Sequence, residues 1–395
     1  MLLKRKLEAV FIFPFILLGR LIAFTKPNKK SYDIYFFFPF YHIGGAEKVH
    51  AQTAQATGNN NCIIYFTRRS HNDLFLPEFK KSGCVVKDIS TYTDNKWLYF
   101  LNLIYRGIIT GYINRQKIKP VVFNGQCNFA YKISPWISKE IPQIELIHSL
   151  NSFSYIRIPF LPFIHQTVMI SKKRIEDHAL LYEKVKIPDY YLEKIKYIPN
   201  AIPLPASITQ KNNDPFIVLY VGRGGTEKRV HLIAAMAKRL HQSHPGIRFE
   251  LLGDVSEILT AAEYPFIKFH GNQTNDKVIQ AIYQQAAILL VTSNTEGFPM
   301  VVIEAMANGC AILSTPVGDI PRHVKQGVNG YLFSSVDNEK HVIDEGVQHI
   351  LTLNNDQQLL ATIAERNISY SKNNFSIAIF NKAYKDLFQS VNKTV

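Results

Sequence analysis

The sequence predicts an α/β fold of two doubly wound domains, each a parallel sheet covered by helices. Its 395 residues exceed what one hydrophobic core usually organises, and the apolar fraction of 47% is ordinary for a globular protein. Short apolar segments bounded by turn residues alternate with helical stretches, which is the pattern of βαβ units. The segments form two series, separated by a region rich in Pro, Asn and Ser at residues 199–215.

The order of these segments predicts the domain organisation. We expect an N-terminal extension at residues 1–30, domains at 31–205 and 206–375, and a helix at 376–395 that packs back toward the first domain. Such sheets bind ligands at the carboxyl ends of their strands, so a central crevice between the domains is the expected site. The expected strands are residues 34–39, 62–66, 85–89, 120–123, 143–148 and 167–170, then 217–222, 248–252, 267–269, 287–291 and 311–314.

The charge distribution and the cysteine content indicate which partners and which compartment to expect. Residues 1–205 hold 28 Lys and Arg against 14 Asp and Glu, whereas residues 206–395 hold 17 of each kind. This asymmetry favours a polyanionic partner of the first half, with a solvated basic surface as the alternative. No module combines stacking aromatics with base-reading groups, so we expect an anionic membrane and no nucleic acid. Four scattered cysteines without a CxxC pair indicate a reducing compartment.

The N-terminal extension supports the membrane interpretation. An apolar run, Ala9–Leu18, is shorter than the about 20 residues of a spanning helix, and Pro14 and Arg20 weaken it further. No clear cleavage site of a signal peptide follows. We expect the segment to lie in a bilayer interface, with a spanning or cleaved segment and packing on the domain as alternatives. Its basic flanks are Lys4, Arg5 and Lys6, then Arg20, Lys26, Lys29 and Lys30.

Two glycine-containing loops follow expected strands and precede expected helices. Gly44 and Gly45 form one, and the other carries Arg223 and Lys228. A diphosphate is bound at such a place by cations and free backbone N–H groups. The loop with Arg223 and Lys228 does not match the Rossmann fingerprint GxGxxG, because Glu227 occupies the position of its third glycine. The sequence also contains no Walker lysine motif. Taken alone, each loop is a weak signal, because surface charges and glycine pairs are common there.

Four segments together resemble the successive landmarks of the retaining glycosyltransferases of family four. The resemblance extends over residues 33–390 and implies the GT-B fold, in which two Rossmann-like domains face a central crevice. The chain departs from the family pattern at Ala201 and Arg229, where glycine is usual. The segments are GGAE at 44–47, YIPNAI at 197–202, VGRGGTEK at 221–228 and EGFPMVVIEAMANGCAILSTPVGDIPRHVKQGVNGYLF at 296–333.

The resemblance also assigns roles to residues. It implies that Glu296 reaches hydroxyls of the donor sugar, that Glu304 holds the ribose hydroxyls, and that backbone N–H groups after the Gly-Phe-Pro turn meet sugar and phosphate. Ionised carboxylates suit this role because they accept paired hydrogen bonds from vicinal diols. The expected donor-binding residues are Gly44, Gly45, Arg223, Lys228, Glu296, Gly297, Phe298, Pro299, Met300, Val301 and Glu304.

Two further polar residues end expected strands. In similar enzymes a histidine such as His148 lies near the donor sugar, although a lone histidine is more often a packed core residue. Asn124 is a weaker candidate for the acceptor side. The expected catalytic residues are His148, Arg223, Lys228 and Glu296.

We therefore expect a hexosyltransferase-type enzyme that moves a sugar from a nucleotide-diphosphate donor to an acceptor hydroxyl with retention of configuration. No Asp-x-Asp motif occurs, so neither a metal nor another cofactor is expected beside the nucleotide sugar. The expected acceptor is a glycan or lipid-linked glycan of cell-surface polysaccharide or lipopolysaccharide assembly, on the cytoplasmic face of the membrane. A sugar-nucleotide epimerase of related fold and a non-catalytic membrane-associated module are the alternatives.

Overall fold

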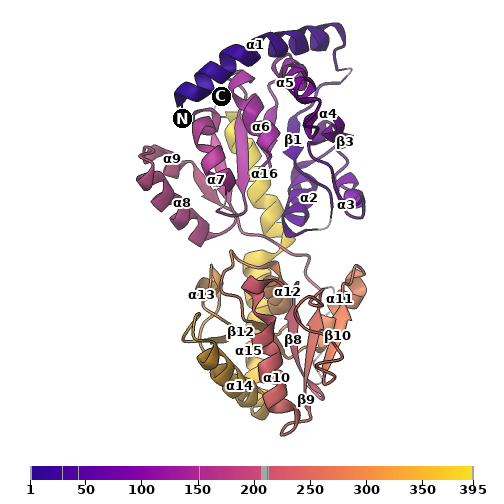
Figure 1. Ribbon diagram of the computed structural model, residues 1–395, viewed down its shortest axis with the longest axis vertical. Helices are drawn as coiled ribbons and strands as arrows, with labels where there is room; N and C mark the ends of the chain where they lie inside the picture. The colour runs from indigo at the N-terminus through magenta and orange to yellow at the C-terminus, as the bar shows by residue number, and fades with distance from the viewer. Residues whose placement is uncertain are drawn as a thin grey trace. The chain divides into compact units, whose positions relative to one another are not determined.

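The computed structural model describes residues 2–28, 30–42, 44–150, 152–205, 211 and 213–393. The chain divides into two compact units (Figure 1). The first comprises residues 1–199 with 380–395, and the second comprises residues 200–379. Lys29 and residues 206–210 and 212, which belong to the predicted basic flank and domain link, lie outside the described residues.

A parallel sheet of seven strands forms the centre of the first unit, in the order β3-β2-β1-β4-β5-β6-β7. The sheet order reverses between β1 and β4, which places a topological switch point there. All six strands predicted for this region are present, with ends shifted by one residue at most. β7 was not predicted, because three half-buried residues give no apolar run. The strands are β1 Ile34–Phe38, β2 Cys62–Phe66, β3 Val85–Asp88, β4 Val121–Asn124, β5 Gln143–Ile147, β6 Gln166–Met169 and β7 Ile195–Tyr197.

Helices cover this sheet, and the last of them returns from the far end of the chain. The rings of Phe388 in α16 lie 6.1 Å from Phe36 and 5.7 Å from Phe123, on the central strands. The helices are α1 Leu2–Thr25, α2 Gly45–Thr57, α3 Leu76–Lys80, α4 Ser90–Thr93, α5 Tyr99–Asn114, α6 Asn128–Ile133, α7 Ser152–Ile156, α8 Lys172–Lys184, α9 Tyr190–Glu193 and α16 Ile377–Lys393, with 3-10 turns η1 Ser134–Trp136 and η2 Ile158–Phe163.

The N-terminal helix α1 is longer than the predicted apolar run. It continues through Pro14 and Arg20 to Thr25, and its stretch Glu8–Thr25 is apolar and long enough to cross a membrane by length and composition alone. The prediction that the segment is too short to span is therefore wrong as to length. One face of α1 packs along α5 (Figure 1), so tertiary contacts outweigh the unfavourable proline.

Small residues allow this close packing of α1 on α5. A Cβ added to Gly19 would overlap the Ile104 carbonyl oxygen and lie 2.8 Å from the Cα of Gly107. A Cβ added to Gly107 would in turn overlap the carbonyl oxygen of Ile16. Farther along, Gly111 faces the Cβ of Ala23. The two backbones therefore touch, as in helix pairs joined through small residues.

We expect Gly107→Val to destabilise the first unit, because an overpacked contact typically costs about 1–3 kcal/mol. Both tryptophans, Trp97 and Trp136, lie in this unit, so their fluorescence during urea unfolding reports on it. Gly45→Val in the same unit is the matched control, because no atom of the described residues lies within 4 Å of an added Cβ there. Equal stability of the two variants would contradict the close contact of α1 with α5.

The second unit contains a parallel sheet of six strands in the order β10-β9-β8-β11-β12-β13. Its five predicted strands are present, and only the short β13 was missed. The strands are β8 Phe216–Val221, β9 Ile247–Leu252, β10 Ile267–Gly271, β11 Ile288–Val291, β12 Ala311–Ser314 and β13 Gly330–Leu332. The helices are α10 Val230–His241, α11 Asp276–Gln285, α12 Met300–Ala307, α13 Ile320–His323, α14 Glu339–Asn355 and α15 Gln357–Phe375, with a 3-10 turn η3 Thr226–Lys228.

Candidate active site

The topology of the second unit marks one place for ligand binding. β8 pairs with β9 on one side and with β11 on the other, so the strand order reverses between β8 and β11. Loops that leave the carboxyl ends of these two strands flank a crevice in open sheets of this kind. The two loops carry Arg223 with Lys228, and Glu296.

The structure joins the two loops through an ion pair. Lys228 Nζ lies 2.6 Å from Glu296 Oε1, and both side chains are largely buried. The same carboxylate oxygen accepts a hydrogen bond from Ser293 Oγ at 2.7 Å. A cation and a carboxylate are thus fixed side by side at the switch point, although 68 residues separate them in the sequence.

The loops are also connected through their backbones. Thr292 Oγ1 donates to the Lys228 carbonyl oxygen at 2.8 Å, and Asn294 N donates to the Glu227 carbonyl oxygen at 2.9 Å. Arg229 has φ +48°, a left-handed conformation that favours glycine. Its Nε donates to the Thr292 carbonyl oxygen at 2.8 Å. These bonds hold the strained residue in place, which explains how arginine occupies a position where the resemblance led us to expect glycine.

Arg223 lies in a different environment from Lys228. Its side chain is 80% exposed and pairs with Glu227, at 3.2 Å. Its carbonyl oxygen accepts a hydrogen bond from Tyr220 at 2.8 Å. A Cβ on Gly224 would lie 2.9 Å from Val255 Cα, so the loop passes close to its neighbour. The structure therefore fixes the backbone of this loop and leaves the guanidinium in solvent.

The Gly-Phe-Pro turn after Glu296 is held from several sides. Phe298 is buried, and its ring stacks on that of His323 at 4.3 Å. The carbonyl oxygen of Gly297 accepts a hydrogen bond from Asp319 N at 2.8 Å. Pro299 then precedes α12, which begins at Met300. Since the first N–H groups of a helix have no acceptor within the helix, this turn presents donors suited to an anion.

Glu304 lies on α12, half-buried, eight positions after Glu296. Its Oε2 accepts a hydrogen bond from the Tyr283 hydroxyl at 2.9 Å. Burial, together with this carboxylate, raises the pKa of Tyr283 well above its usual value, so the hydroxyl remains a donor. Tyr283, on α11, was not predicted as a site residue, because an apolar helix position gives no sequence signal of such a role.

In the first unit, Gly44 follows β1 and caps the N-terminus of α2, and Gly45 is the first residue of that helix. A Cβ on Gly44 would overlap the carboxylate of Glu47, whereas a Cβ on Gly45 would meet no atom of the described residues within 4 Å. Glu47 is buried, burial raises its pKa, and His42 Nε2 lies 4.0 Å away. Gly45 thus provides an open backbone surface at the β1–β4 switch point, where Asn124 also ends its strand.

His148 follows β5 and is paired with a second histidine, His50 of α2. Their Nε2 atoms are 2.9 Å apart, and the His50 ring stacks on Phe38 at 4.6 Å. Burial lowers the pKa of His148 to about 4, and burial with the neighbouring His148 lowers that of His50. Both rings are therefore neutral at neutral pH, and one of them donates to the other. His50 was not predicted as a site residue, because it lies 98 residues from His148 in the sequence and belongs to no motif.

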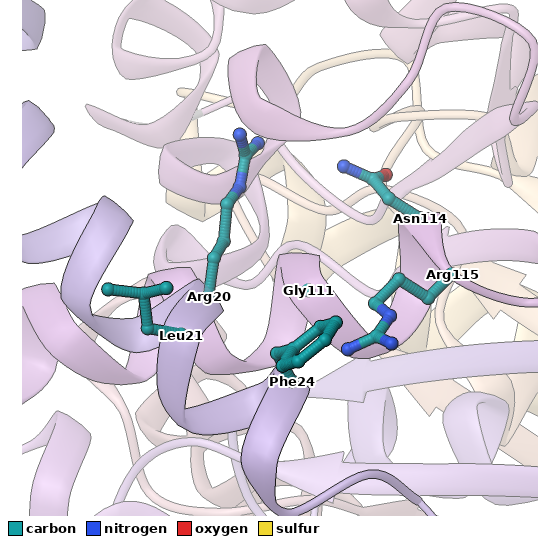
Figure 2. A pocket seen from close by; sticks show the side chains of 6 residues that line it. All are labelled: Arg20, Leu21, Phe24, Gly111, Asn114 and Arg115. Atoms are coloured by element: carbon teal, nitrogen blue, oxygen red, sulfur yellow. The ribbon is translucent and has the colours of Figure 1, made fainter.

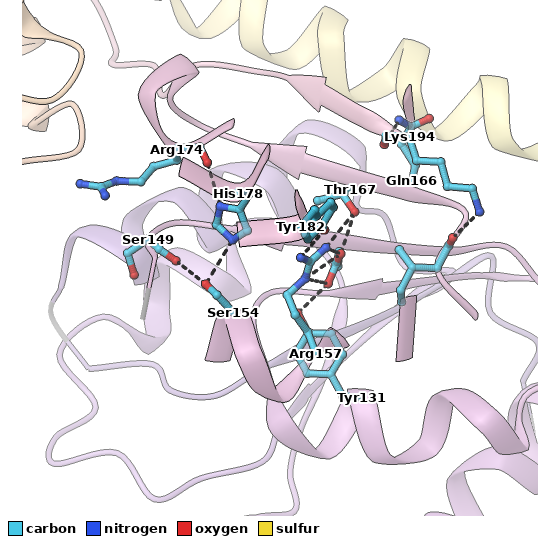
Figure 3. Close-up of polar contacts among 12 residues, drawn as sticks. Tyr131, Ser149, Ser154, Arg157, Gln166, Thr167, Arg174, His178, Tyr182 and Lys194 are labelled. Atoms are coloured by element: carbon cyan, nitrogen blue, oxygen red, sulfur yellow. Dashed lines mark hydrogen bonds and ion pairs between the residues drawn. The ribbon is translucent and has the colours of Figure 1, made fainter. Parts of the chain in front are cut away.

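A buried polar network anchors β5 just before His148 (Figure 3). The Arg157 guanidinium forms a fully buried ion pair with Glu145 of β5. The hydroxyls of Tyr131 and Thr167 donate to the Glu145 carboxylate at 2.7 Å each, and Arg157 Nη1 donates to the Tyr182 hydroxyl at 2.5 Å. Burial alone would raise the pKa of Glu145, but Arg157 and these donors lower it.

The segment after His148 is attached to α8 by a second set of contacts (Figure 3). His178 Nε2 lies 3.1 Å from Ser154 Oγ, which donates to the Ser149 carbonyl oxygen at 3.4 Å. Burial lowers the pKa of His178 to about 4, so this ring is neutral as well. Among the described residues, no group of three His, Cys, Asp or Glu side chains could hold a metal ion.

Comparison with known proteins identifies the kind of enzyme. Residues 206–367 match the family model described as glycosyl transferases group 1. A lipopolysaccharide 1,6-galactosyltransferase of Salmonella typhimurium is 25% identical over 299 residues, which cover 67% of this chain and 81% of that protein. An uncharacterized glycosyltransferase of Methanocaldococcus jannaschii is 25% identical over 273 residues, which cover 62% of this chain and 74% of that protein.

Solved structures show the same architecture. Anabaena HepE, crystallised in complex with UDP and glucose, has a TM-score of 0.69 at 17% identity, with 91% of this chain and 100% of that chain covered. The apo form of the lipopolysaccharide outer core galactosyltransferase WaaB has a TM-score of 0.65 at 18% identity, with 90% and 99% covered. The family match, the named relatives and the fold together support a transferase enzyme: the protein is a glycosyltransferase with the GT-B fold.

Proposed function

We propose that the protein transfers a sugar from a nucleotide-diphosphate donor to an acceptor hydroxyl with retention of anomeric configuration. The ion pair of Lys228 with Glu296 at the β8–β11 switch point is the observation that carries this proposal. It places a cation for the diphosphate beside a carboxylate for sugar hydroxyls. Glu304, with its donor Tyr283, supplies the carboxylate for the ribose. Structures of similar fold with bound UDP and glucose support this class of donor.

In the proposed reaction the bond between the anomeric carbon and the donor phosphate oxygen breaks, and a bond to the acceptor oxygen forms on the same face of the sugar. Negative charge grows on the diphosphate as it leaves. Lys228, Arg223 and the N–H groups at the start of α12 oppose this charge, which lowers the barrier. The proton of the acceptor hydroxyl passes to an oxygen of the leaving diphosphate. No carboxylate becomes covalently attached to the sugar.

We also propose roles for residues of the first unit. His148, neutral and held by His50, offers a hydrogen-bonding group for a sugar hydroxyl without adding a charge. Gly44 and Gly45 offer backbone that a phosphate or sugar can approach closely. Asn124 Oδ1 accepts a hydrogen bond from Cys127 N at 2.6 Å, whereas its buried Nδ2 has no partner among the described residues and is the donor that an acceptor would meet.

A screen of radiolabelled nucleotide sugars tests the function. With membrane extract as acceptor source, the parent protein should transfer label from one donor into glycan or lipid-linked glycan, and NMR of the product should show the anomeric configuration of the donor. EDTA should leave the rate nearly unchanged under the proposed metal-free mechanism. Isomerised donor formed without acceptor would instead indicate an epimerase, and an inverted product would contradict retention.

We infer further that the enzyme works on the inner face of a membrane, in cell-surface polysaccharide or lipopolysaccharide assembly. The face of α1 that points away from α5 exposes eight large apolar side chains. Two cations, Arg20 and Arg115, lie beside this apolar face (Figure 2). Together with Leu21 and Phe24 they line a cavity of about 300 Å³. The Arg115 guanidinium lies 4.4 Å from the centre of the Phe24 ring. An apolar face with basic neighbours suits an anionic bilayer interface. The exposed side chains are Val10, Phe11, Phe13, Phe15, Leu17, Leu18, Leu21 and Phe24.

The double variant Phe11→Ser with Phe24→Ser should bind anionic vesicles about 3 kcal/mol more weakly, since each phenylalanine loses about 1.5 kcal/mol or more of apolar burial. Vesicle sedimentation measures the change. Leu180→Ser is the matched control, because Leu180 is 63% exposed on α8 of the same unit. Binding of the parent should also fall with salt, because the Debye length shortens to about 3 Å at 1 M. Binding that is indifferent to both changes would refute the membrane role of α1.

A further inference from the structure

We propose that Arg229 is a positioning residue of the transfer site, which holds the turn with Lys228 against the segment that leads to Glu296. In this role Arg229 acts through Lys228 and does not itself contact the substrate. The role rests on the proposed function, in which Lys228 opposes the charge of the donor diphosphate. Arg229 is also a position at which the sequence departs from the glycine that the resemblance implies.

The conformation and the burial of Arg229 are both unfavourable in themselves. Its φ of +48° is a left-handed conformation, which glycine adopts readily and which side chains disfavour. Its side chain is 7% exposed, and a buried charge is costly unless hydrogen bonds compensate for the lost water. Residues of this kind persist where the surrounding contacts hold them, so the contacts of the guanidinium have to offset both costs.

The guanidinium joins the Lys228 turn to two other segments of the second unit. Arg229 Nε donates to the Thr292 carbonyl oxygen at 2.8 Å, and Nη1 donates to the Val336 carbonyl oxygen at 2.6 Å. Thr292 directly follows β11, and Val336 lies between β13 and α14. The rigid fork of an arginine can hold two such acceptors at once. Glycine at this position would keep the backbone conformation and lose both contacts.

The segment that contains Val336 is itself held in place by α14. Ser334 N donates to Glu345 Oε2 of this helix at 2.7 Å. Asn338 caps the same helix, because its Oδ1 accepts a hydrogen bond from His341 N at 3.2 Å. Arg229 therefore binds to a fixed part of the fold and not to a free loop.

The contacts of Arg229 lead to both members of the ion pair. Thr292, which accepts from Arg229, donates in turn through its Oγ1 to the Lys228 carbonyl oxygen at 2.8 Å. The next residue, Ser293, donates to Glu296 Oε1 at 2.7 Å, and Lys228 Nζ lies 2.6 Å from the same oxygen. The cation is thus fixed before a substrate binds. Preorganised charges stabilise a transition state better than mobile ones, which gives the buried arginine its purpose.

Hydrogen exchange tests the tie without any substrate. Arg229→Gly removes both hydrogen bonds of the guanidinium and adds no backbone strain. In this variant we expect the amides of the turn, including Lys228 N with its 2.9 Å bond to the Gly225 carbonyl oxygen, to exchange about tenfold faster or more. Mass spectrometry of peptides that cover residues 222–232 measures the rates. Exchange at the rate of the parent would overturn the tie.

A double-mutant cycle tests whether Arg229 acts through Lys228. With the donor found by the screen, Arg229→Gly should lower kcat by about tenfold or more, because small displacements of a catalytic group are costly. In the Lys228→Ala background the same substitution should change kcat by about twofold at most, since coupled residues are not additive. An equal loss in both backgrounds would overturn the positioning role, as would parent kcat in Arg229→Gly.

Two further variants complete the test. Lys186→Gly is the matched control, because Lys186 has φ +55° and is exposed in the first unit, so the change relieves the same kind of backbone strain. Parent kinetics and parent exchange at residues 222–232 are expected for it. Thr292→Val removes the hydroxyl bonded to the carbonyl oxygens of Lys228 and Arg229, so it should also lower kcat, and it keeps the test valid if Arg229→Gly does not fold.

Failure of this role and failure of the proposed function give different results. Parent kcat in Arg229→Gly and in Thr292→Val, together with a large loss in Lys228→Ala, would overturn the role of Arg229 alone. Parent kcat in Lys228→Ala would instead remove Lys228 from the proposed mechanism, and the role of Arg229 would be lost with it. The exchange rates of the Lys228 turn are independent of both results.

Discussion

Lys228→Ala should lower kcat by about a hundredfold or more, since removing one group that stabilises developing negative charge typically costs about 10²–10³ in rate. The variant also leaves Glu296 without its 2.6 Å partner, so the KM for the donor should rise as well. Steady-state kinetics with the donor found by the screen measure both quantities. Lys238→Ala, which removes an exposed lysine from α10 of the same unit, is the control.

Arg223→Ala should cause a loss of similar order for a different reason. Its exposed guanidinium pairs with Glu227 in the structure and can exchange that partner for the diphosphate. Because Glu296 keeps Lys228, we expect the effect to fall on kcat with little change in KM. Activity of both variants within twofold of the parent would remove the two cations from the proposed mechanism.

Arg157→Met should destabilise the first unit by about 3–5 kcal/mol, because it leaves the buried Glu145 carboxylate without its cation. Urea unfolding followed by tryptophan fluorescence measures the change. The double variant Arg157→Met with Glu145→Leu should recover much of the stability, since replacing both partners of a buried ion pair with apolar residues is often neutral. A double variant as unstable as the single one would show that the other polar contacts, not the charge, dominate.

The same ion pair predicts a pH dependence. The pKa of Glu145 is lowered below its usual 4.5 in the folded protein. Between the unfolded-state and folded-state pKa values, the unfolded protein therefore binds more protons than the folded one. The ion pair contributes fully to the stability of the fold above about pH 4.5, and this contribution is lost as the pH falls through the folded-state pKa. The gap in stability between Arg157→Met and the parent should therefore be largest at neutral pH.

The fold could be predicted from the sequence because buried parallel strands give continuous apolar runs. Ile34–Phe38 and Phe216–Val221 stand out for this reason. The short strands Ile195–Tyr197 and Gly330–Leu332 could not, because three residues carry no pattern. The full length of α1 was missed because its interruption by Pro14 is compensated by contacts with α5, which no local pattern records.

The candidate site was predicted in part for similar reasons. Lys228 and Glu296 lie in loops after adjacent strands, and the structure brings them into contact. The partners His50 and Tyr283 could not be found, because each contributes through tertiary packing from a helix position without a motif. Nor could the pairing of Arg223 with Glu227 be predicted, because Lys228 follows Glu227 directly and was an equally possible partner for that carboxylate.

Calorimetric titration of nucleosides and nucleoside diphosphates tests most directly whether the second unit binds the diphosphate through Lys228 and the ribose through Glu304. The series uses uridine, guanosine, adenosine and cytidine with their diphosphates. We predict that the parent binds one diphosphate far more tightly than its nucleoside, that Lys228→Ala loses most of this difference, and that Glu304→Gln weakens both ligands alike, by about 1–3 kcal/mol. An undiminished preference for the diphosphate in Lys228→Ala would contradict the proposed site.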